Sequence, residues 1–323
     1  MMSTGVSIVY TTHRPEPRFE WFADGLARQV DGEVEVIVVD GLHSVERGAE
    51  FERIVCRRFP FRYAAAKPSP FNGPYRLTRR DYAAPASARN TGIVYAVHPY
   101  VVFVDDLSVP GPGWWGAARD AAQHGYVAAG AYAKHLELIV SDGVIVSSRP
   151  TPEGLDSRIA IRAETRLVQV GGGALYGCSF GAPKSLLHDL NGLDELCDSI
   201  MGEDSQLGYR IEHAGIPIYY DRRMFTVESE ELHHQGERPV RLDDPLHPVL
   251  YMARLREFGV RRRTRRGRFD ATHLLFDIVH GTRTTESLGN YYRLAELTAK
   301  NIDSVRDAFP QHYWVDQRPL AEL

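Results

Sequence analysis

Three apolar runs in the first 110 residues each end abruptly in polar side chains. They are VSIVY (6–10), VEVIVVD (34–40) and YVVFVDD (100–106). Between the first two, Phe19, Phe22, Leu26 and Val30 recur at helical spacing, which indicates an amphipathic helix. Strands that are apolar on both faces and alternate with helices are typical of a parallel sheet built from right-handed βαβ units. The sequence therefore predicts an α/β fold with a mostly parallel sheet flanked by helices.

The polar ends of these runs predict where a ligand binds. Thr11, Asp40 and Asp106 each end or directly follow one of the apolar runs. In open α/β sheets, ligands bind outside the carboxyl ends of the strands. We therefore expect these three side chains to lie around one site.

The chain between these runs and residue 240 carries further local signals. Segment 57–90 is rich in proline and aromatic residues and has no sustained period, so we predict a long lid or binding loop. The run 136–148 predicts a hairpin that turns at Asp142 and Gly143. The run 204–215 predicts a helix with Asp204 as its N-cap.

The character of the chain changes near residue 240. We predict a domain over residues 1–240 and a helical, arginine-rich extension over residues 241–323. Eight arginines crowd one stretch of fifteen residues in this extension. They are Arg254, Arg256, Arg261, Arg262, Arg263, Arg265, Arg266 and Arg268. A solvated helix face, a contact with a partner subunit, or binding of an anionic acceptor such as a phosphorylated glycan, a lipid head group or DNA would each account for this charge.

The composition excludes several classes of protein. The chain has 323 residues, a formal net charge of −4, 43% hydrophobic and 25% charged side chains, which is a globular composition. It contains no run of about 18 apolar residues, so we expect no transmembrane segment. Its start lacks a basic stretch followed by an apolar one, so we expect no secretory signal. Three cysteines without a CxxC pair fit a reducing compartment, and we expect a cytoplasmic protein.

Adjacent carboxylates end the third apolar run and predict a metal site. Asp105 and Asp106 follow a buried strand directly and precede PGPGWW (110–115). Mg²⁺ and Mn²⁺ commonly bind one or two protein carboxylates and complete their coordination with substrate phosphates and water. A pair of exposed turn aspartates is the alternative interpretation. Two acids beside a buried strand repel each other without a cation, which favours the metal site.

Five segments, in the order in which they occur along the chain, resemble one family. They are VSIVYTTHRP, VEVIVVDG, SARNTGI (87–93), FVDD with PGPGWW, and the block from GGG (171–173) through NGLDE to GEDSQLGYRIEHAG. This set, over residues 5–235, resembles the family 2 glycosyltransferases of GT-A fold. The resemblance implies a nucleotide-sugar donor, a divalent metal (Mn²⁺ or Mg²⁺) and transfer of a sugar to an acceptor hydroxyl.

The resemblance also implies roles for individual residues. Asp106 matches the direct metal ligand, and Asp204, in the pair Glu203–Asp204, matches the catalytic base. Asp40 would hydrogen-bond the base of the nucleotide, commonly uracil, so a UDP-sugar is the expected donor. The other positions implied to contact the donor are Thr11, His13, Arg14, Arg89, Asn90, Asp105, Gly172 and Gly173.

Several positions depart from the family or leave alternatives open. Leu107 stands where the family often has a third acid, so the metal needs another ligand, for which His233 or His234 is a candidate. The QxxRW signature of processive members is absent, which predicts transfer of one sugar per encounter. Trp114 and Trp115 would either stack on the acceptor or pack in the core.

The residue types agree with an inverting mechanism. A bound cation stabilises the nucleoside diphosphate that leaves, and one carboxylate takes the proton of the acceptor hydroxyl. A single base with no second carboxylate as nucleophile implies inversion at the anomeric carbon. Two alternatives remain: the same chemistry on hydroxymethylated bases of DNA, and a catalytically inactive module that binds a sugar nucleotide.

Overall fold

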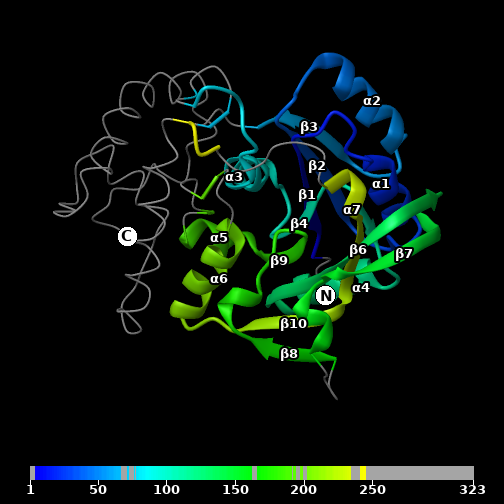
Figure 1. Ribbon diagram of the computed structural model, residues 1–323. Helices are drawn as coiled ribbons and strands as arrows, with labels where there is room; N and C mark the ends of the chain where they lie inside the picture. Colours follow the sequence, from blue (N-terminus) through cyan, green and yellow to red (C-terminus); the bar gives the residue numbers. More distant parts are fainter. Residues whose placement is uncertain are drawn as a thin grey trace.

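A computed structural model describes residues 4–66, 71–72, 76, 78–161, 166–190, 192–193, 197–198, 202–233 and 241–244. These residues form a ten-stranded sheet with helices on both faces (Figure 1). The strands follow the order β3-β2-β1-β4-β9-β6-β10-β5, with β7 paired to β6 and β8 paired to β10. The α/β architecture predicted from the three apolar runs is confirmed.

The first half of the sheet is parallel. Its strands are β1 (Val6–Thr12), β2 (Val34–Asp40), β3 (Phe61–Ala65) and β4 (Tyr100–Asp105). In the register of this half, Thr12 lies opposite Asp40, and Thr11 lies opposite Asp105. The polar ends of three strands therefore meet at one edge of the sheet, as the sequence predicted.

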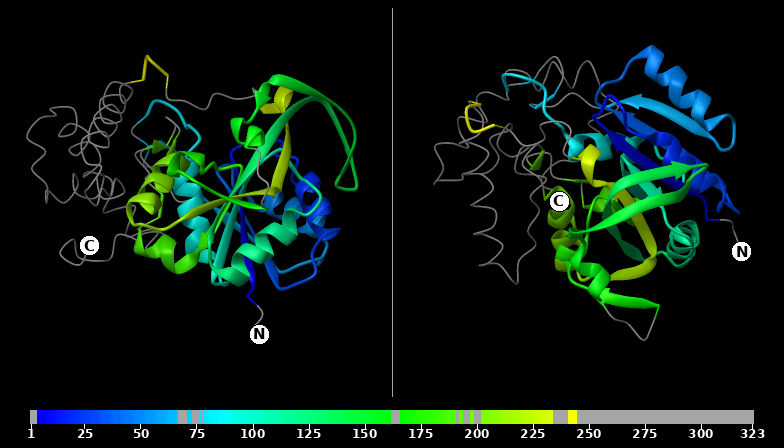
Figure 2. Two further views of the ribbon diagram at one scale, coloured as in Figure 1. Left: turned by 90° about the horizontal axis from the view of Figure 1, so that it is seen from below. Right: turned by 45° about the vertical axis from the view of Figure 1, so that its right-hand side comes forward.

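The second half of the sheet is mixed and contributes the far wall of the site. Its strands are β5 (Ser108–Pro110), β6 (Val127–Ser141), β7 (Val144–Leu155), β8 (Leu167–Val170), β9 (Ser179–Pro183) and β10 (Ile218–Ser229). β9 runs antiparallel to both β4 and β6, whereas β10 is parallel to β6. The predicted hairpin at Asp142 and Gly143 is confirmed. Its strands β6 and β7 extend well beyond the helices (Figure 2).

Helices cover both faces of the sheet because its buried strands are apolar on both sides. One core cluster contains Ile8 and Tyr10 of β1 and the other contains Val9, so alternate residues of one strand enter opposite layers. On the first face lie α1 (Phe19–Ala27), α2 (Val45–Val55) and α4 (Trp114–His124). On the second face lie α3 (Pro85–Tyr95), α5 (Lys184–Asp189) and α6 (Glu203–His213).

Three short helical segments complete the described chain. They are η1 (Ser157–Ala160), η2 (Gly172–Ala174) and α7 (Glu230–His233). α7 follows β10 directly and contacts β6. Helix α6 begins at Glu203 after the positive φ of Gly202, so Gly202, and not Asp204 as expected, is its N-cap. None of the helices among the described residues is long and apolar enough to cross a membrane.

The predicted loop over 57–90 and the predicted extension over 241–323 differ in outcome. The expected long loop over 57–90 is wrong in extent, because its start forms β3 and its end forms the first turns of α3. Tyr63 and Arg89, which read as loop residues, are thereby fixed in regular elements. The predicted extension over 241–323 lies outside the described residues except for 241–244. The domain boundary at residue 240 therefore stays a prediction.

Candidate active site

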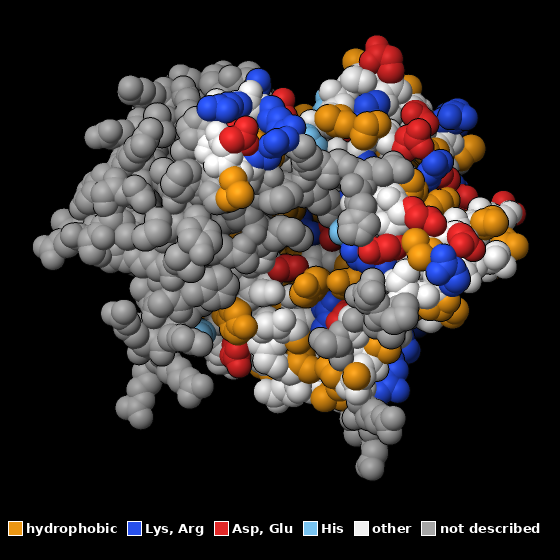
Figure 3. All heavy atoms as spheres, viewed as in Figure 1, with side chains coloured by type: hydrophobic (Ala, Val, Ile, Leu, Met, Phe, Trp, Pro, Cys, Tyr) orange, Lys and Arg blue, Asp and Glu red, His pale blue; other side chains and the backbone are white. Residues whose placement is uncertain are grey.

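A cavity of about 550 Å³ opens where the carboxyl ends of β1 and β4 face β10 and the start of α6. Nine of the predicted site residues line it. They are Thr11, His13, Arg14, Arg89, Asp105, Asp106, Glu203, Asp204 and His233. Acidic and basic side chains lie together in the hollow near the middle of the face in Figure 3. Segments far apart in sequence therefore contribute to one charged cavity.

Asp106 is held by two side chains at the end of β1. Its Oδ2 accepts a hydrogen bond from Thr12 Oγ1 at 2.9 Å, and its Oδ1 lies 3.1 Å from Nε of Arg14. Burial is the main reason that the pKa of Asp106 rises to about 6, and the charge of Asp105 adds to it. Burial thus outweighs the ion pair with Arg14.

Arg14 connects Asp106 to α7. Its two terminal nitrogens donate to the backbone carbonyls of Leu232, at 2.8 Å, and His233, at 3.0 Å. Burial, followed by the charges of Lys134 and Arg14, lowers the pKa of His233 to about 4. The imidazole is therefore neutral at neutral pH, which is the form that binds metals. The second candidate, His234, lies outside the described residues.

Arg89 is the buried centre of the opposite wall. Its Nη2 lies 2.5 Å from Asp105 Oδ1, and its Nη1 lies 2.5 Å from Glu203 Oε1. Burial lowers the pKa of this guanidinium, but the surrounding carboxylates outweigh that effect and raise the pKa well above its ordinary value. Burial and the charge of Asp204 raise the pKa of Glu203 to about 7. Arg89 therefore joins the strand-end carboxylates to the carboxylates of α6.

Asp204 lies in the first turn of α6 with its carboxylate fixed by backbone donors. The amide of Gly177 donates to Oδ2 at 2.7 Å, and the amide of Ser205 donates to Oδ1 at 2.6 Å. Each carboxylate oxygen can accept more than one hydrogen bond, so both retain capacity towards the cavity. Neither bond involves a cationic side chain, in contrast to Glu203.

Sequence reasoning missed an aromatic wall beside Asp204. Tyr132 and Tyr176 line the cavity with ring centroids 5.8 Å apart. The guanidinium of Arg158 lies 4.6 Å from the centre of the Tyr176 ring, and this ring is 43% exposed. Tyr176 belongs to the glycine-rich run 171–177, which was interpreted through its glycines alone.

Sequence reasoning also missed Glu228 and Lys134. Both line the cavity, from the neighbouring strands β10 and β6, where they are directly paired. A signal was present in each case. Glu228 is a charged residue inside the apolar run FTVES, and Lys134 is one of four lysines in the chain. Only the pairing of distant strands shows that they face the same cavity.

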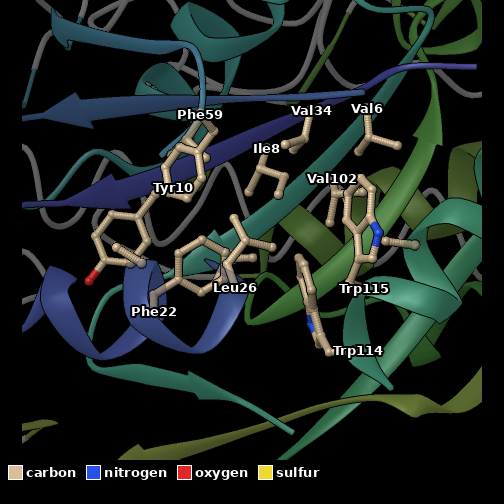
Figure 4. Packing of buried hydrophobic residues seen from close by; sticks show 14 of the residues in the cluster. Val6, Ile8, Tyr10, Phe22, Leu26, Val34, Phe59, Val102, Trp114 and Trp115 are labelled. Atoms are coloured by element: carbon tan, nitrogen blue, oxygen red, sulfur yellow. The ribbon is translucent and has the colours of Figure 1, made fainter. Parts of the chain in front are cut away.

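Of the two alternatives for Trp114 and Trp115, packing in the core is the one that the structure shows. Both are buried at the start of α4, in the core cluster beneath β1 (Figure 4). Nε1 of Trp114 donates to Ser179 Oγ at 2.9 Å, and Nε1 of Trp115 donates to Asp31 Oδ1 at 2.7 Å. Satisfied indole N–H groups and close packing make these side chains structural.

The structure also keeps Asp40 and Asn90 off the cavity wall. Asp40 is fully buried, and its carboxylate accepts from Arg47 Nε at 2.7 Å and from the Tyr63 hydroxyl at 2.9 Å. The side chain of Asn90 bonds both backbone groups of Leu193. Direct contacts of these two side chains with a donor are therefore not supported, although Gly41, beside Asp40, does line the cavity.

The triple glycine serves helix packing. A Cβ on Gly172 would lie 2.5 Å from the backbone carbonyl of Gly208 in α6, and one on Gly173 would lie 2.7 Å from the Tyr209 hydroxyl. These glycines let η2 approach α6 closely and are not among the residues that line the cavity, so their contact with the donor stays a prediction. The contact instead holds the helix that carries Asp204.

Replacing Gly172 with alanine is expected to destabilise the protein by about 1–3 kcal/mol, because the new methyl group overpacks a backbone-to-backbone contact. The matched control is Gly171→Ala. A Cβ there meets nothing closer than Glu212 at 3.6 Å, so its effect should stay within about 0.5 kcal/mol. Urea unfolding of both variants measures the difference. Equal stability of the two would contradict the packing role of Gly172.

No family model matches the chain, and no curated protein matches its sequence. Solved structures do match. The crystal structure of GalNAc-T7 with UDP, GalNAc and Mn²⁺ superposes with a TM-score of 0.57 at 12% identity, covering 98% of this chain and 59% of that one. The crystal structure of S. aureus TarS 1-349 gives 0.51 at 14% identity, covering 97% and 88%.

These likenesses show the fold, which is the GT-A fold of nucleotide-sugar glycosyltransferases. The expected fold class is therefore confirmed. This chain spans 59% of the length of the first of these structures. At such low identity, activity, donor and metal do not transfer with the fold.

The carboxylates that line the cavity have the chemistry of ligands for a divalent cation. Within the described part of the chain, no three His, Cys, Asp or Glu side chains form a ready-made metal site. Carboxylate oxygens are nevertheless the ligands that Mg²⁺ and Mn²⁺ prefer. Asp105, Asp106 and Glu228 share one cavity, and Oε1 of Glu228 is buried with no hydrogen-bond partner among the described residues.

Proposed function

We propose that this protein is a metal-dependent glycosyltransferase that moves one sugar from a nucleotide sugar to an acceptor hydroxyl. The observation that carries the proposal is the cavity itself. In a GT-A fold, the strand-end carboxylates Asp105 and Asp106 line it on one side, and Asp204 lines it on another. The first pair suits a metal diphosphate, and the last suits a base.

The nucleotide would occupy the part of the cavity nearest the parallel strands. His13, Gly41, Ala66 and Asn72 line this part, with Asn72 Nδ2 3.4 Å from His13 Nδ1. Burial is the main cause that lowers the pKa of His13, so the ring is neutral at neutral pH and can donate or accept a hydrogen bond with a base. We propose a uracil base, and therefore a UDP-sugar donor.

The diphosphate would lie between Arg14 and the strand-end carboxylates. Asp106 is the proposed direct metal ligand, and His233 provides a neutral imidazole close by. A bound Mn²⁺ or Mg²⁺ acts as a Lewis acid that stabilises charge on the departing diphosphate. Arg14 adds a fixed cation on the same side of the cavity.

Asp204 is the proposed base that takes the proton of the acceptor hydroxyl. Glu203 is engaged by Arg89, whereas among the described residues Asp204 accepts hydrogen bonds from the backbone amides of Gly177 and Ser205, which orient it. The attack would displace the nucleoside diphosphate in one step and invert the anomeric carbon. Tyr132 and Tyr176 provide aromatic faces on which an acceptor ring can pack.

The test is calorimetric titration of UDP, GDP and dTDP into the full chain, with and without Mn²⁺. We expect UDP to bind, and to bind more tightly with Mn²⁺. Asp106→Ala should remove the Mn²⁺-dependent part of the affinity and leave the metal-independent part, because the base contacts remain. If no nucleotide binds, or if Asp106→Ala binds UDP with Mn²⁺ as tightly as the wild type, the proposal fails.

The arginines expected to bind an anionic acceptor, including DNA, lie outside the described residues. The described cavity therefore gives no specific support to a DNA acceptor. A module without activity would bind the nucleotide but leave the sugar nucleotide uncleaved, so nucleotide release during incubation with a UDP-sugar separates an enzyme from a binding module.

A further inference from the structure

Glu228 is a buried carboxylate whose local contacts do not account for it. It lies near the end of β10, is 5% exposed and lines the cavity. Its Oε1 has no hydrogen-bond partner among the described residues. The nearest basic residue along the paired strand, Lys134, has its ammonium 3.6 Å from Glu230. A buried acceptor without a donor costs free energy, so such a group calls for an explanation.

The charges around Glu228 do not balance. Five carboxylates line the cavity, from Asp105, Asp106, Glu203, Asp204 and Glu228, against three cationic side chains, from Arg14, Arg89 and Lys134. His233 is neutral because its pKa is about 4. Burial, with the charges of Asp105 and Asp106, raises the pKa of Glu228 to about 8. With all carboxylates ionised, these side chains are two positive charges short, which is the charge of one Mn²⁺ or Mg²⁺.

The strand-end motif also lacks an oxygen that Glu228 can supply. Leu107 follows the two aspartates, is buried, and has a positive φ of 65° with its amide bonded to Pro17. Its side chain therefore provides no ligand atom for a cation in the cavity. Both oxygens of Asp106 already accept hydrogen bonds, from Thr12 and Arg14. Oε1 of Glu228, in contrast, accepts no hydrogen bond from the described residues and can bind a cation.

We propose that Glu228 is a ligand of the divalent cation, supplied from β10 in place of a third acid after Asp106. The inference rests on the proposed function, because it assigns a residue to the metal of that site. It differs from the expectation that a histidine alone completes the coordination. A carboxylate from β10 would also tie the metal to the strand beside β6, and so to the half of the cavity that contains Tyr132 and Lys134.

The test measures Mn²⁺ binding to the full chain by electron paramagnetic resonance, first alone and then with UDP. Glu228→Gln keeps the shape of the side chain and removes its charge. We expect it to weaken Mn²⁺ binding by at least about 10-fold. The matched control is Glu231→Gln, three residues along the chain, exposed and off the cavity wall, which should bind Mn²⁺ as the wild type does.

A second readout separates a ligand from a structural residue. Without metal and at pH 9, where Glu228 is ionised, Glu228→Gln should melt about 2–4 °C higher than the wild type, because it removes a buried and uncompensated charge. A structural role would give the opposite sign. Glu228→Asp, which keeps the charge but withdraws the oxygens by one methylene, should also weaken Mn²⁺ binding while leaving the melting temperature lower than that of Glu228→Gln.

The outcomes distinguish this inference from the proposed function. If Glu228→Gln and Glu228→Asp both bind Mn²⁺ with wild-type affinity, Glu228 is not a ligand. If the wild type binds UDP but no Mn²⁺, the inference fails while the nucleotide site stands. If Glu228→Gln loses Mn²⁺ but the wild type neither binds nor cleaves any nucleotide sugar, the inference holds and the proposed function fails.

Discussion

Replacing Asp204 with asparagine is expected to slow cleavage of the donor by about 10²–10⁴-fold, the range that general-base catalysis typically contributes. The variant keeps the shape of the side chain but can no longer take a proton, and its single oxygen can accept from only one of the amides of Gly177 and Ser205. Both changes lie away from the part of the cavity proposed for the nucleotide. The affinity for the nucleotide should therefore stay within about twofold of the wild type.

The measurement is the rate of UDP release from the sugar nucleotide that binds best, with water as the acceptor. Glu212→Gln is the matched control, since it makes the same carboxylate-to-amide change on an exposed position of α6. It should keep the wild-type rate. If Asp204→Asn also keeps the wild-type rate, another group takes the proton, and the assignment of the base is wrong.

The second large effect is on stability. Arg89→Met should destabilise the protein by about 3–5 kcal/mol at neutral pH, because it leaves the buried carboxylate of Glu203 without its partner. Asp105, which is more exposed, contributes less. Methionine fills a similar volume, so the loss reports the missing charge more than a cavity. Arg89→Lys keeps the charge and should fall between the wild type and Arg89→Met.

The pH dependence of this effect has a definite sign. The pKa of Glu203 is already about 7 in the folded protein, against an ordinary value of 4.5, and removal of Arg89 raises it further. Up to about pH 7, Glu203 holds a proton that the unfolded chain has lost in both the wild type and the variant, so the two lose stability alike as pH rises. Above pH 7 the wild type releases this proton and the variant keeps it, so only the variant goes on losing stability. Urea unfolding at pH 6 should therefore show a smaller difference from the wild type than unfolding at pH 9.

An exposed ion pair provides the control for Arg89. Arg166→Met breaks the contact of a half-exposed guanidinium with Asp120, for which about 0–1 kcal/mol is expected. A loss for Arg89→Met that is as small as this, or that does not change with pH, would contradict the central role given to the buried arginine.

The sequence was sufficient to predict the layered fold and the meeting of the strand ends. The apolar runs at 6–10, 34–40 and 100–106 are local patterns, and parallel pairing then places their carboxyl ends together. Asp105 reaches the cavity for that reason, whereas Asp204 reaches it from the first turn of α6. Glycines were less informative, since a glycine required for helix packing reads like one that faces a ligand.

The misplaced residues share a physical cause. Whether Trp114 packs inwards depends on the exact face of α4 that meets the sheet, and whether Asp40 is free depends on Arg47 and Tyr63 of other elements. Glu228 enters the site only because β10 pairs with β6 and β5. These facts are set by pairing between distant segments, which no local pattern encodes.

The three contacts of Arg14 connect the end of β4 to helix α7. One guanidinium bonds Asp106 at the end of β4 and two carbonyls of α7, the last helix before residue 234. A ligand that draws Asp106 away from Arg14 therefore changes the free energy with which α7 is held. Linkage requires the reverse as well: an event that shifts α7 alters ligand affinity by the same factor. The position of α7 and the occupancy of the cavity are in this way thermodynamically coupled.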